Sequence, residues 1–454
     1  MFILFSCTPH SPENICRDDT VILKEMKALL KNNLLDSWYP RIIDETNGGY
    51  HTRFNYKWEL ESSFPKPIVT LARGLWVASK AAQRYPHEKK FRTAAQHGFK
   101  FLNEKAWDSE YGGFYVTIPV KELPGPEHYK TAYGNAFAIY GLAAYYELTQ
   151  SEKALELAQT AFHWLDEHFH DPVYGGYFQF ASREGISYLD KVNFDRSIFP
   201  ENYRPFCHCK EFNSTIHLLE AFSALYQQWP DSLLRERLSE TLSILRDTMT
   251  TPTGYLKLMF TEDWQHISFK DSTRKFILEN SYFDHVSFGH DVETAFLLLE
   301  AAHLLSQKCY EQTLPVAKRL IDHSLKTGFD EQFTGIFYEG YYFKHDSAIT
   351  IINRRKQWWV QAEGLNALLM FTVLFPENPH YKNAFYHLWN FIKTYVIDHK
   401  RGGWYQEAIS SNPRKNKRAS KAGPWKSCYH NYRALSQCVE LLETGSMPFL
   451  EPAR

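Results

Sequence analysis

The segment at residues 287–293, with the sequence SFGHDVE, combines a histidine and a carboxylate at a spacing that suits proton transfer. His290 and Glu293 are three residues apart, so on a helix their side chains share one face. The carboxylate can then orient the imidazole or hold one of its tautomers, as is common around histidines that act as acids or bases. We therefore expect His290 to be an acid–base residue supported by Glu293.

Other residues extend this chemistry. Asn213 and His217 have the i, i+4 spacing that places two polar groups on one helix face, and His430 lies near the end of the sequence. Because imidazole gains and loses protons near neutral pH, two histidines can flank one carbon atom from opposite faces. Removing a proton next to an aldehyde builds negative charge on oxygen, which the guanidinium of Arg73 can stabilise. Proton abstraction and return is the predicted reaction class.

The tryptophans and tyrosines that accompany these residues suit a sugar, whose C–H faces stack on aromatic rings while polar side chains bind its hydroxyl groups. A glycoside hydrolase is the competing class, and it needs a general-acid carboxylate facing a second carboxylate across the scissile bond. Glu293 and Glu363 are the candidates, but each follows a helix neighbour, His290 or Trp359, that looks like its structural partner. A sugar-binding barrel without catalysis would not need the histidines.

A repeated turn signal indicates which elements position these side chains. One or two glycines are followed, directly or after one residue, by an aromatic residue at six places, usually with Asp or Glu several positions upstream. Such clusters predict a tight turn leading into a short strand. The clusters are Gly48-Gly49-Tyr50, Gly112-Gly113-Phe114, Gly175-Gly176-Tyr177, Gly254-Tyr255, Gly335-Ile336-Phe337 and Gly402-Gly403-Trp404.

The intervals between clusters hold pairs of stretches with apolar residues at helical spacing, which predicts twelve helices in six hairpins. Clear examples are residues 68–82, 136–148, 218–226, 294–305 and 360–371. Six helical hairpins, each closed by a Gly-aromatic turn, predict an all-α fold, the (α/α)6 barrel of six inner and six outer helices. A straight α-solenoid is the alternative, but its repeats are shorter, at about 35 to 45 residues.

The helix after each turn is more apolar and richer in small residues than its partner, so we assign it to the inner ring. All inner helices then begin at the same end of the barrel. Chemically capable side chains cluster at these beginnings: Arg73, Trp76, Lys130, Tyr133, Asn135, Asn213, His217, His290, Asp291, Glu293, Trp358, Trp359, Glu363, Trp425, Tyr429 and His430. Such residues are seldom fully buried without partners, so their convergence predicts a cleft at this end of the axis.

The overall composition excludes several classes of function. The chain has 454 residues, of which 44% are hydrophobic and 16% aromatic, and a net charge of -1. This balance argues against a nucleic-acid partner or an anionic membrane surface, since each needs a concentrated basic face. The one basic run, residues 414–426, is interrupted by Gly and Pro and is predicted to be a solvated loop. No apolar run reaches the roughly 20 residues that a membrane span needs.

We expect one catalytic barrel at residues 18–445, between tails at 1–17 and 446–454. Seven cysteines, spread along the chain, indicate free thiols in a reduced, cytoplasmic setting. Alternatively, the apolar start of the chain is the remnant of a lipoprotein signal ending at Cys7, which would make the protein periplasmic. Cys207-His208-Cys209 lacks a second pair at zinc-finger spacing, so no metal is predicted. The expected partner is a small sugar, and the expected assembly is a monomer or homodimer.

Six stretches resemble the N-acylglucosamine 2-epimerase superfamily, and within it the branch of cellobiose and mannose 2-epimerases. One stretch falls on or just before each predicted inner helix: residues 73–76 (RGLW), 130–140 (KTAYGNAFAIY), 213–221 (NSTIHLLEA), 287–293 (SFGHDVE), 358–363 (WWVQAE) and 425–431 (WKSCYHN). The resemblance implies an (α/α)6 fold and a cofactor-free reaction at C2 of a reducing-end aldose. It implies that the ring opens, one histidine takes the C2 proton to form a cis-enediolate, and a second histidine returns the proton to the other face.

The resemblance also assigns roles to the matching residues. It implies that His290 and His430 are the acid–base pair, that Glu293 supports His290, and that Arg73 holds the enediolate oxygens. The residues it implies for substrate binding are Tyr133, Asn213, His217, Trp359, Glu363 and Trp425. Among them, Asn213 and His217 are expected to assist ring opening, and the aromatic residues to line the pocket.

Two departures from the pattern bear on the substrate. Thr215 stands where many cellobiose epimerases carry a histidine. The proline-rich stretch at 118–129 and the long insert at 183–210 are expected to narrow the cleft and favour a monosaccharide over a disaccharide. In the same superfamily, this histidine pair also serves aldose–ketose isomerases, which return the proton to C1, so an isomerase converting mannose to fructose stays open as an alternative.

Overall fold

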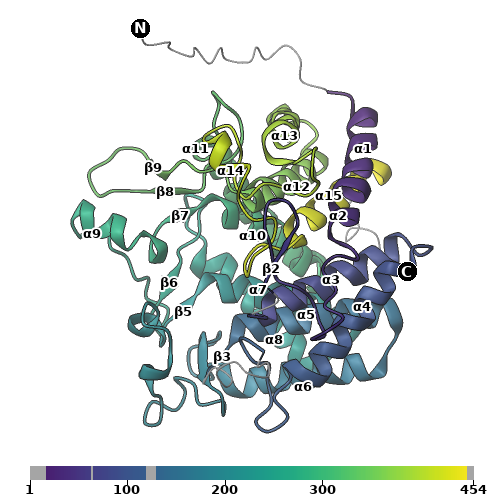
Figure 1. The fold of residues 1–454 in the computed structure, drawn as a ribbon. Helices are drawn as coiled ribbons and strands as arrows, with labels where there is room; N and C mark the ends of the chain where they lie inside the picture. Colours follow the sequence, from purple (N-terminus) through teal and green to yellow (C-terminus); the bar gives the residue numbers. More distant parts are fainter. Residues whose placement is uncertain (1–16, 63–64, 119–128, 447–454) are drawn as a thin grey trace.

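The computed structural model describes residues 17–62, 65–118 and 129–446. Within these ranges, twelve helices of ten residues or more form two rings, one inside the other (Figure 1). The inner ring consists of α3 (Ile68–Arg84), α5 (Ala132–Thr149), α7 (Phe212–Gln228), α10 (Phe288–Leu305), α12 (Trp358–Leu374) and α15 (Tyr429–Thr444). The outer ring consists of α1 (Asp19–Ala28), α4 (Lys89–Phe101), α6 (Glu152–Phe169), α8 (Ser232–Ser243), α11 (Gln307–Thr327) and α13 (Pro379–Phe391).

The inner ring is closed. Each inner helix packs on the next, and α15 packs on α3, which completes the circle. Each outer helix packs on one inner helix, and α1 packs on α15, so the two ends of the barrel sequence lie side by side (Figure 1). The protein is therefore the predicted (α/α)6 barrel and not a solenoid. None of the described helices is long and apolar enough to span a bilayer.

Short elements connect the two rings. The short helices are α2 (Asp36–Trp38), α9 (Arg274–Glu279) and α14 (Pro413–Asn416), with 3-10 turns at Arg196–Ile198, Arg204–Phe206 and Ser281–Phe283. Four outer helices end in or are followed by π-helical segments, at Leu29–Leu35, Leu102–Ala106, Ile244–Met249 and Ile392–Val396. The strands are β1 (Arg53–Phe54), β2 (Leu60–Ser62), β3 (Tyr129–Thr131), β4 (Phe180–Ser182), β5 (Lys210–Glu211), β6 (Met259–Phe260), β7 (Val286–Ser287), β8 (Glu339–Tyr341) and β9 (Thr350–Asn353). They pair antiparallel as β1–β2, β3–β4, β5–β6 and β7–β8–β9.

The sequence of each helix explains the ring to which it belongs. Inner helices such as α12 are buried on nearly every side, as their continuous apolar sequences require. Small residues let them approach closely: a Cβ added at Gly141 of α5 would lie 2.9 Å from the carbonyl oxygen of Ala72 on α3. Outer helices are amphipathic, and α4 buries Phe91, Ala94 and Gly98 along one stripe while its opposite face meets solvent.

The six predicted turns are present as hairpins, each closed by one antiparallel bridge. The bridges join Ile43 to Tyr50, Trp107 to Phe114, His170 to Tyr177, Thr250 to Leu256, Phe329 to Ile336 and Ile397 to Trp404. In the second hairpin, Gly112 and Gly113 both have a φ of 71°, a left-handed conformation that only glycine adopts without strain. The paired glycines are therefore required by the backbone of the turn.

A buried ion pair joins five of the six hairpins to the segment before an inner helix, in four of them to a lysine two residues before the helix and in the last to Lys421, eight residues before α15. In each hairpin, one carboxylate oxygen of an aspartate accepts hydrogen bonds from two backbone N–H groups of the turn. The other oxygen binds a buried lysine at 2.7 to 3.0 Å; the pairs are Asp44–Lys66, Asp108–Lys130, Asp171–Lys210, Asp330–Lys356 and Asp398–Lys421. In the fourth hairpin Thr251 replaces the aspartate and Val286 replaces the lysine. Each hairpin therefore has either both the aspartate and the lysine or neither of them.

These pairs correct two sequence-based expectations. Lys130, which we grouped with the chemically capable residues, is fully buried in its pair with Asp108. The basic run at 414–426 is not wholly solvated, because Lys421 and Lys426 are only 1% and 5% exposed. Lys426 Nζ donates to the carbonyl oxygens of Trp404 and Ser420, and burial lowers its pKa well below the ordinary value. A lysine in a polar stretch of sequence can therefore be buried where carboxylate or carbonyl oxygens accept hydrogen bonds from its ammonium group.

Some expectations concern residues outside the described ranges. The lipoprotein alternative concerns Cys7, and most of the stretch at 118–129 also falls there.

The buried pairs generate a stability prediction. Burial tends to raise the pKa of Asp398, but Lys421 holds it below its usual value, so the pair stabilises the fold above about pH 4 and the contribution fades at lower pH. Lys421→Met leaves Asp398 buried without its partner and is expected to cost about 3–5 kcal/mol at pH 7, measured by urea unfolding. The control is Lys27→Met, whose partner Glu443 is 38% exposed, with an expected cost under about 1 kcal/mol. Equal losses in the two variants would contradict this account.

Candidate active site

A cavity of about 700 Å³ opens at the end of the barrel where the inner helices begin. Side chains from the first turns of all six inner helices line it, so the predicted convergence is present. The cavity brings together all the predicted site residues except one: Arg73, Tyr133, Asn213, His217, His290, Glu293, Trp359, Trp425 and His430. Glu363 is the exception, because it is fully buried behind the cavity wall.

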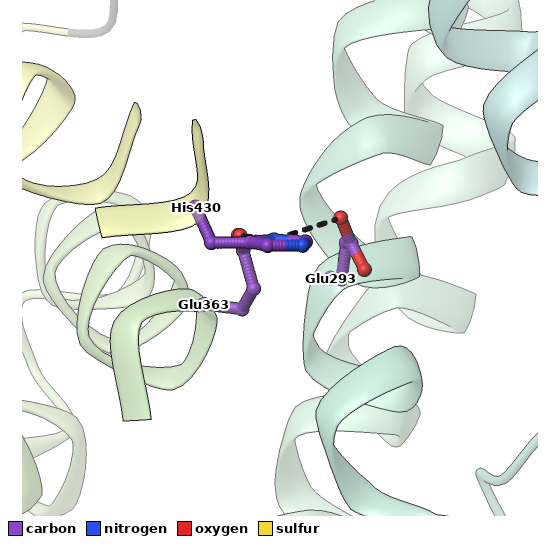
Figure 2. A group of neighbouring side chains, drawn as sticks. All are labelled: Glu293, Glu363 and His430. Carbon is purple, nitrogen blue, oxygen red and sulfur yellow. Dashed lines mark hydrogen bonds and ion pairs between the residues drawn. The ribbon is translucent and has the colours of Figure 1, made fainter. Parts of the chain in front are cut away.

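His430 is held by a carboxylate from a neighbouring helix. Its Nδ1 is hydrogen-bonded to Oε1 of Glu363 on α12 at 2.6 Å. Figure 2 shows the imidazole pointing toward Glu293 of α10, whose Oε1 lies 3.9 Å from the same Nδ1. Glu363, which we had counted among the substrate-binding residues, thus lies behind His430 and orients it. An i, i+4 pairing with Trp359 is not its role, since a buried carboxylate needs a polar partner.

His290 is held by different chemistry. Its Nδ1 is hydrogen-bonded to the hydroxyl of Ser287 at 2.6 Å. Its ring packs edge-on against Phe212, with ring centroids 4.6 Å apart, and tilted against Trp359 at 4.7 Å. The expectation that Glu293 supports His290 is wrong for this structure, because Glu293 pairs with a cation on another helix. The i, i+3 spacing aligned the two side chains, but a buried carboxylate is attracted more strongly by a full positive charge.

That cation is Arg433, which lies on α15 one turn beyond His430. Its Nη1 donates to Glu220 Oε1 on α7, and its Nη2 donates to Glu293 Oε1 and to Glu363 Oε1, the last at 2.8 Å. All four side chains are at most 4% exposed. Glu220 in turn is bonded through Oε2 to His217 Nδ1 at 2.9 Å. One guanidinium therefore links four inner helices beneath the cavity floor.

Sequence reasoning missed Arg433 and Glu220, although a signal was available. Glu293 and Glu363 lie in the second turn of largely apolar helices, and Glu220 lies in the third turn of another. Three carboxylates that must be buried at one end of a barrel require a shared cation nearby. Arg433 is placed to supply it on the last inner helix, three residues after His430.

Burial and this network set the protonation states. Burial lowers the pKa of both His290 and His430 well below the ordinary value, and Arg73 adds to the effect. Burial raises the pKa of Glu363 well above its usual range even though Arg433 opposes the shift. Burial also tends to raise the pKa of Glu220, but Arg433 and His217 outweigh it and hold the pKa at about 2. Burial thus favours the neutral form of His290 and His430, the form that can accept a proton.

The guanidinium of Arg73 is positioned to stabilise negative charge in the cavity. Its Nη2 donates to the Tyr133 hydroxyl at 3.0 Å, and its guanidinium lies 4.3 Å from the Phe137 ring centroid and 5.0 Å from that of Tyr429. Its Nε is buried and makes no hydrogen bond to any described residue. Aromatic faces thus fix the cation while leaving donor capacity for a ligand.

Aromatic rings form the walls. Tyr133 packs edge-on against His217 at 5.2 Å and lies 6.3 Å from Trp425. Trp425 is 65% exposed, which places it at the rim, whereas Trp359 lies between the two cavity histidines, 4.7 Å from His290 and 5.6 Å from His430. A flat apolar ligand surface with hydroxyl groups at its edge fits these walls.

Glu293, Glu363 and His430 form the one group of side chains in the described ranges that could hold a metal ion, with ligand atoms within 4.8 Å of one another (Figure 2). However, Arg433 Nη2 already bridges the two carboxylates, so the protein itself supplies the positive charge. Cys207 and Cys209 are buried, and burial raises the pKa of Cys209 to about 12. High thiol pKa values disfavour the thiolate that zinc requires.

The insert at 183–210 folds over one side of the cavity. A small apolar cluster of Phe180, Phe199 and Cys207 holds it together. From the insert, the Tyr203 hydroxyl lies 3.3 Å from that of Tyr282, and both residues line the cavity. Thr215, where the sequence departs from many cellobiose epimerases, is not part of the lining; its hydroxyl donates to the carbonyl oxygen of Glu211.

Comparison with known proteins agrees with this geometry. The family described as N-acylglucosamine 2-epimerase matches residues 48–434. The cellobiose 2-epimerase of Bacteroides fragilis is 29% identical over 426 residues, which cover 93% of this chain and 99% of that protein. The D-mannose isomerase of Thermobifida fusca is 23% identical over 377 residues, covering 82% of this chain and 86% of that protein. The structure of the cellobiose 2-epimerase from Spirochaeta thermophila, 26% identical, has a TM-score of 0.76 over 94% of this chain and 98% of that one.

The Arg433 network generates a prediction about pH. Arg433→Met removes the cation shared by the buried carboxylates, so the folded-state pKa of Glu220 rises from about 2 to above its unfolded value, and that of Glu363, already raised by burial, rises further. Carboxyl groups shifted in this direction destabilise the fold increasingly as the pH rises through those values. Relative to the wild type, the variant should lose about 3–5 kcal/mol of unfolding free energy at pH 8 and clearly less at pH 4.5, measured by urea unfolding. A penalty that does not change with pH would refute this view of the network.

Proposed function

This chain belongs to the N-acylglucosamine 2-epimerase family and is an isomerase that acts as an epimerase, and on this premise we propose that it interconverts D-glucose and D-mannose. The substrate is the free sugar or the reducing-end unit of a β-1,4-linked disaccharide such as cellobiose. No cofactor takes part. The relatives named cellobiose 2-epimerase, matched over nearly their whole length, support this choice of sugars.

The proposed reaction has four steps. The sugar ring opens to expose the aldehyde, and one histidine removes the proton from C2. The electron pair of the C2–H bond moves into the C1–C2 bond, and negative charge collects on the oxygen of C1, giving a cis-enediolate. After rotation about C2–C3, the second histidine, which enters the cycle as an imidazolium, donates its Nε2 proton to the opposite face of C2, and the aldehyde forms again. The first histidine keeps the proton taken from C2, so the two histidines have exchanged protonation states. Proton and electrons balance without any further reactant.

One observation carries the proposal: two imidazoles from different helices face one cavity, and the Nδ1 of each is hydrogen-bonded to a protein side chain. His290 and His430 lie on either side of Trp359 and leave Nε2 as the atom able to exchange a proton with the ligand. Their lowered pKa values suit the base that removes a proton near neutral pH. Glu363, behind His430, is hydrogen-bonded to its Nδ1 and holds the ring in this orientation.

The other lining residues take supporting roles. The guanidinium of Arg73 stabilises the enediolate oxygens, because its charge is already fixed and largely desolvated. Asn213 and His217 bind the sugar and assist ring opening, and Tyr133, Trp359 and Trp425 stack on its C–H faces. Glu293 retains one oxygen, Oε2, that accepts no hydrogen bond from described residues, so it can accept one from a sugar hydroxyl.

An aldose–ketose isomerase, converting mannose to fructose, is the second candidate, since a relative at 23% identity is named D-mannose isomerase. It uses the same proton removal but returns the proton to C1. A glycoside hydrolase fits less well. Its two carboxylates must flank the scissile bond several ångströms apart, whereas Glu293 and Glu363 share one nitrogen of Arg433.

The first test of the function uses heavy water. The protein is incubated separately with glucose, mannose and cellobiose in D2O, and the products are followed by NMR. Epimerisation gives the other C2 epimer carrying deuterium at C2, because the transferred proton equilibrates with solvent on the histidines. Fructose as the main product would instead establish the isomerase, and release of glucose from cellobiose the hydrolase. Prior dialysis against a strong chelator should leave the rate unchanged, since Arg433 provides the cation of the site.

The second test concerns the two histidines. His290→Asn and His430→Asn should each lower kcat by at least about a hundredfold with an unchanged helical circular dichroism spectrum. His380→Asn, at an exposed position on α13, serves as the matched control. Because burial lowers the pKa of both histidines, wild-type kcat/KM should hold steady as the pH falls past 6.5 and decline only below it. A decline of kcat/KM that already begins at or above pH 6.5 as the pH is lowered would overturn the two-histidine scheme. Near-normal activity in either variant would overturn it as well.

A further inference from the structure

Ser287 is the last residue before α10 and occupies the N-cap position of that helix. Serine is a preferred N-cap because its hydroxyl usually accepts a hydrogen bond from a backbone N–H of the first turn. Here the hydroxyl makes no such bond. Instead it lies 2.6 Å from Nδ1 of His290, the residue whose backbone N–H an N-cap serine commonly binds.

Equivalent positions in the same barrel behave differently. Thr131 caps α5 by accepting from the N–H of Gly134, and Glu211 caps α7 by accepting from Asn213 and Ser214. Ser306, at the start of α11, accepts from the N–H of Cys309. Not every cap of the barrel uses its side chain in this way, since Ser151 at the start of α6 makes no side-chain cap bond either. At Ser287, however, the hydroxyl is bonded to a cavity histidine of its own helix.

The surroundings of Ser287 and His290 leave the imidazole little freedom. Ser287 is 1% exposed, and its backbone pairs with Glu339 in the β7–β8 ladder. Phe212 and Trp359 pack against the His290 ring. Ring position is thus fixed by packing, and Ser287 is the polar contact that distinguishes the two ring nitrogens.

We propose that Ser287 is a positioning residue that holds His290 in the Nδ1–H tautomer and so makes Nε2 the nitrogen that exchanges the C2 proton. The serine oxygen accepts from Nδ1–H when His290 is neutral. It accepts from the same N–H when Nε2 has gained the proton, so the bond persists through the whole cycle. This inference rests on the proposed function, because it names the atom that the epimerisation uses.

The proposal also separates the two histidines chemically. His430 is hydrogen-bonded to an ionisable carboxyl group, that of Glu363, whereas His290 is bonded to a hydroxyl group that stays neutral. The titratable and charged groups that face His290 are His217 on α7, Arg73 on α3 and His285 just before β7, with Glu293 on its own helix. The first three disfavour a second positive charge on His290, and no anion bonded to the ring opposes them. The charged form of His290 is therefore disfavoured, as the lowered pKa of this residue indicates.

The test compares four variants by kinetics and by NMR of 15N-labelled histidine. Ser287→Ala should lower kcat on the order of tenfold or more while changing KM less. Ser287→Thr keeps the hydroxyl, as Thr131 does at the corresponding place in α5, and should restore most of the activity. Ser287→Asp places an anion beside Nδ1 and should move the acidic limb of kcat/KM to higher pH. Ser306→Ala is the matched control: it removes a hydroxyl that does cap a helix, so it should lower the urea midpoint but leave kcat and the pH profile unchanged.

The NMR measurement does not depend on turnover. In the wild type, the signals that disappear in His290→Asn should be those of a protonated Nδ1 and an unprotonated Nε2, and Ser287→Ala should lose this fixed pattern. A protonated Nε2 in the wild type, or a Ser287→Ala variant with full activity and an unchanged tautomer, would overturn the inference. If the wild type epimerises no sugar, the proposed function fails, while the tautomer result still decides the role of Ser287.

Discussion

The structure of the site depends on one buried cation. Arg433 joins Glu220, Glu293 and Glu363, so a single guanidinium connects α15 to α7, α10 and α12. Three carboxylates could not be ionised so close together in a medium of low polarity without it. The position of His430 follows from this arrangement, because Glu363 is fixed by Arg433 on one side and by the imidazole on the other. His217 is fixed in the same way through Glu220. The geometry of the cavity therefore depends on an electrostatic network of which Glu293 reaches the lining, while Arg433, Glu220 and Glu363 lie behind it.

The sequence predicted the fold and the convergence of the site, because both follow from periodic signals. Glycine pairs mark the hairpins through their backbone conformation, and the hairpins determine which helices are inner and where they begin. What could not be predicted was the partner of each charged side chain. The spacing of His290 and Glu293 fits a pair on one helix, yet Glu293 turns to Arg433, a choice decided by contacts between helices. The spacing of residues in the sequence predicts which side chains are neighbours on one helix. It does not predict which residue of another helix a buried charge will pair with, as Glu293 and Arg433 show.

The same limit explains the lysines. Lys130 at a helix start and Lys421 in a polar loop looked like a site residue and a solvated residue, but both are buried partners of hairpin aspartates. The repeated aspartate before the turn glycines could have indicated these lysines, because a buried aspartate that recurs in each hairpin needs a cation that recurs as well. The fourth hairpin supports this interpretation, because Thr251 and Val286 replace both members. That hairpin precedes α10, the helix that carries His290, and its inner-helix start is held by the β7–β8 pairing instead.

The closure of the ring by α15 has a consequence for the order in which the protein is made. Helix α15 follows the other five inner helices in the chain and packs against α1 and α3, which are synthesised first. It also brings both His430 and Arg433. Until it leaves the ribosome, Glu220, Glu293 and Glu363 have no shared cation, and burying them together is unfavourable. The ring can therefore close only with α15 in place, and the helix that closes it is also the one that brings His430 to the cavity.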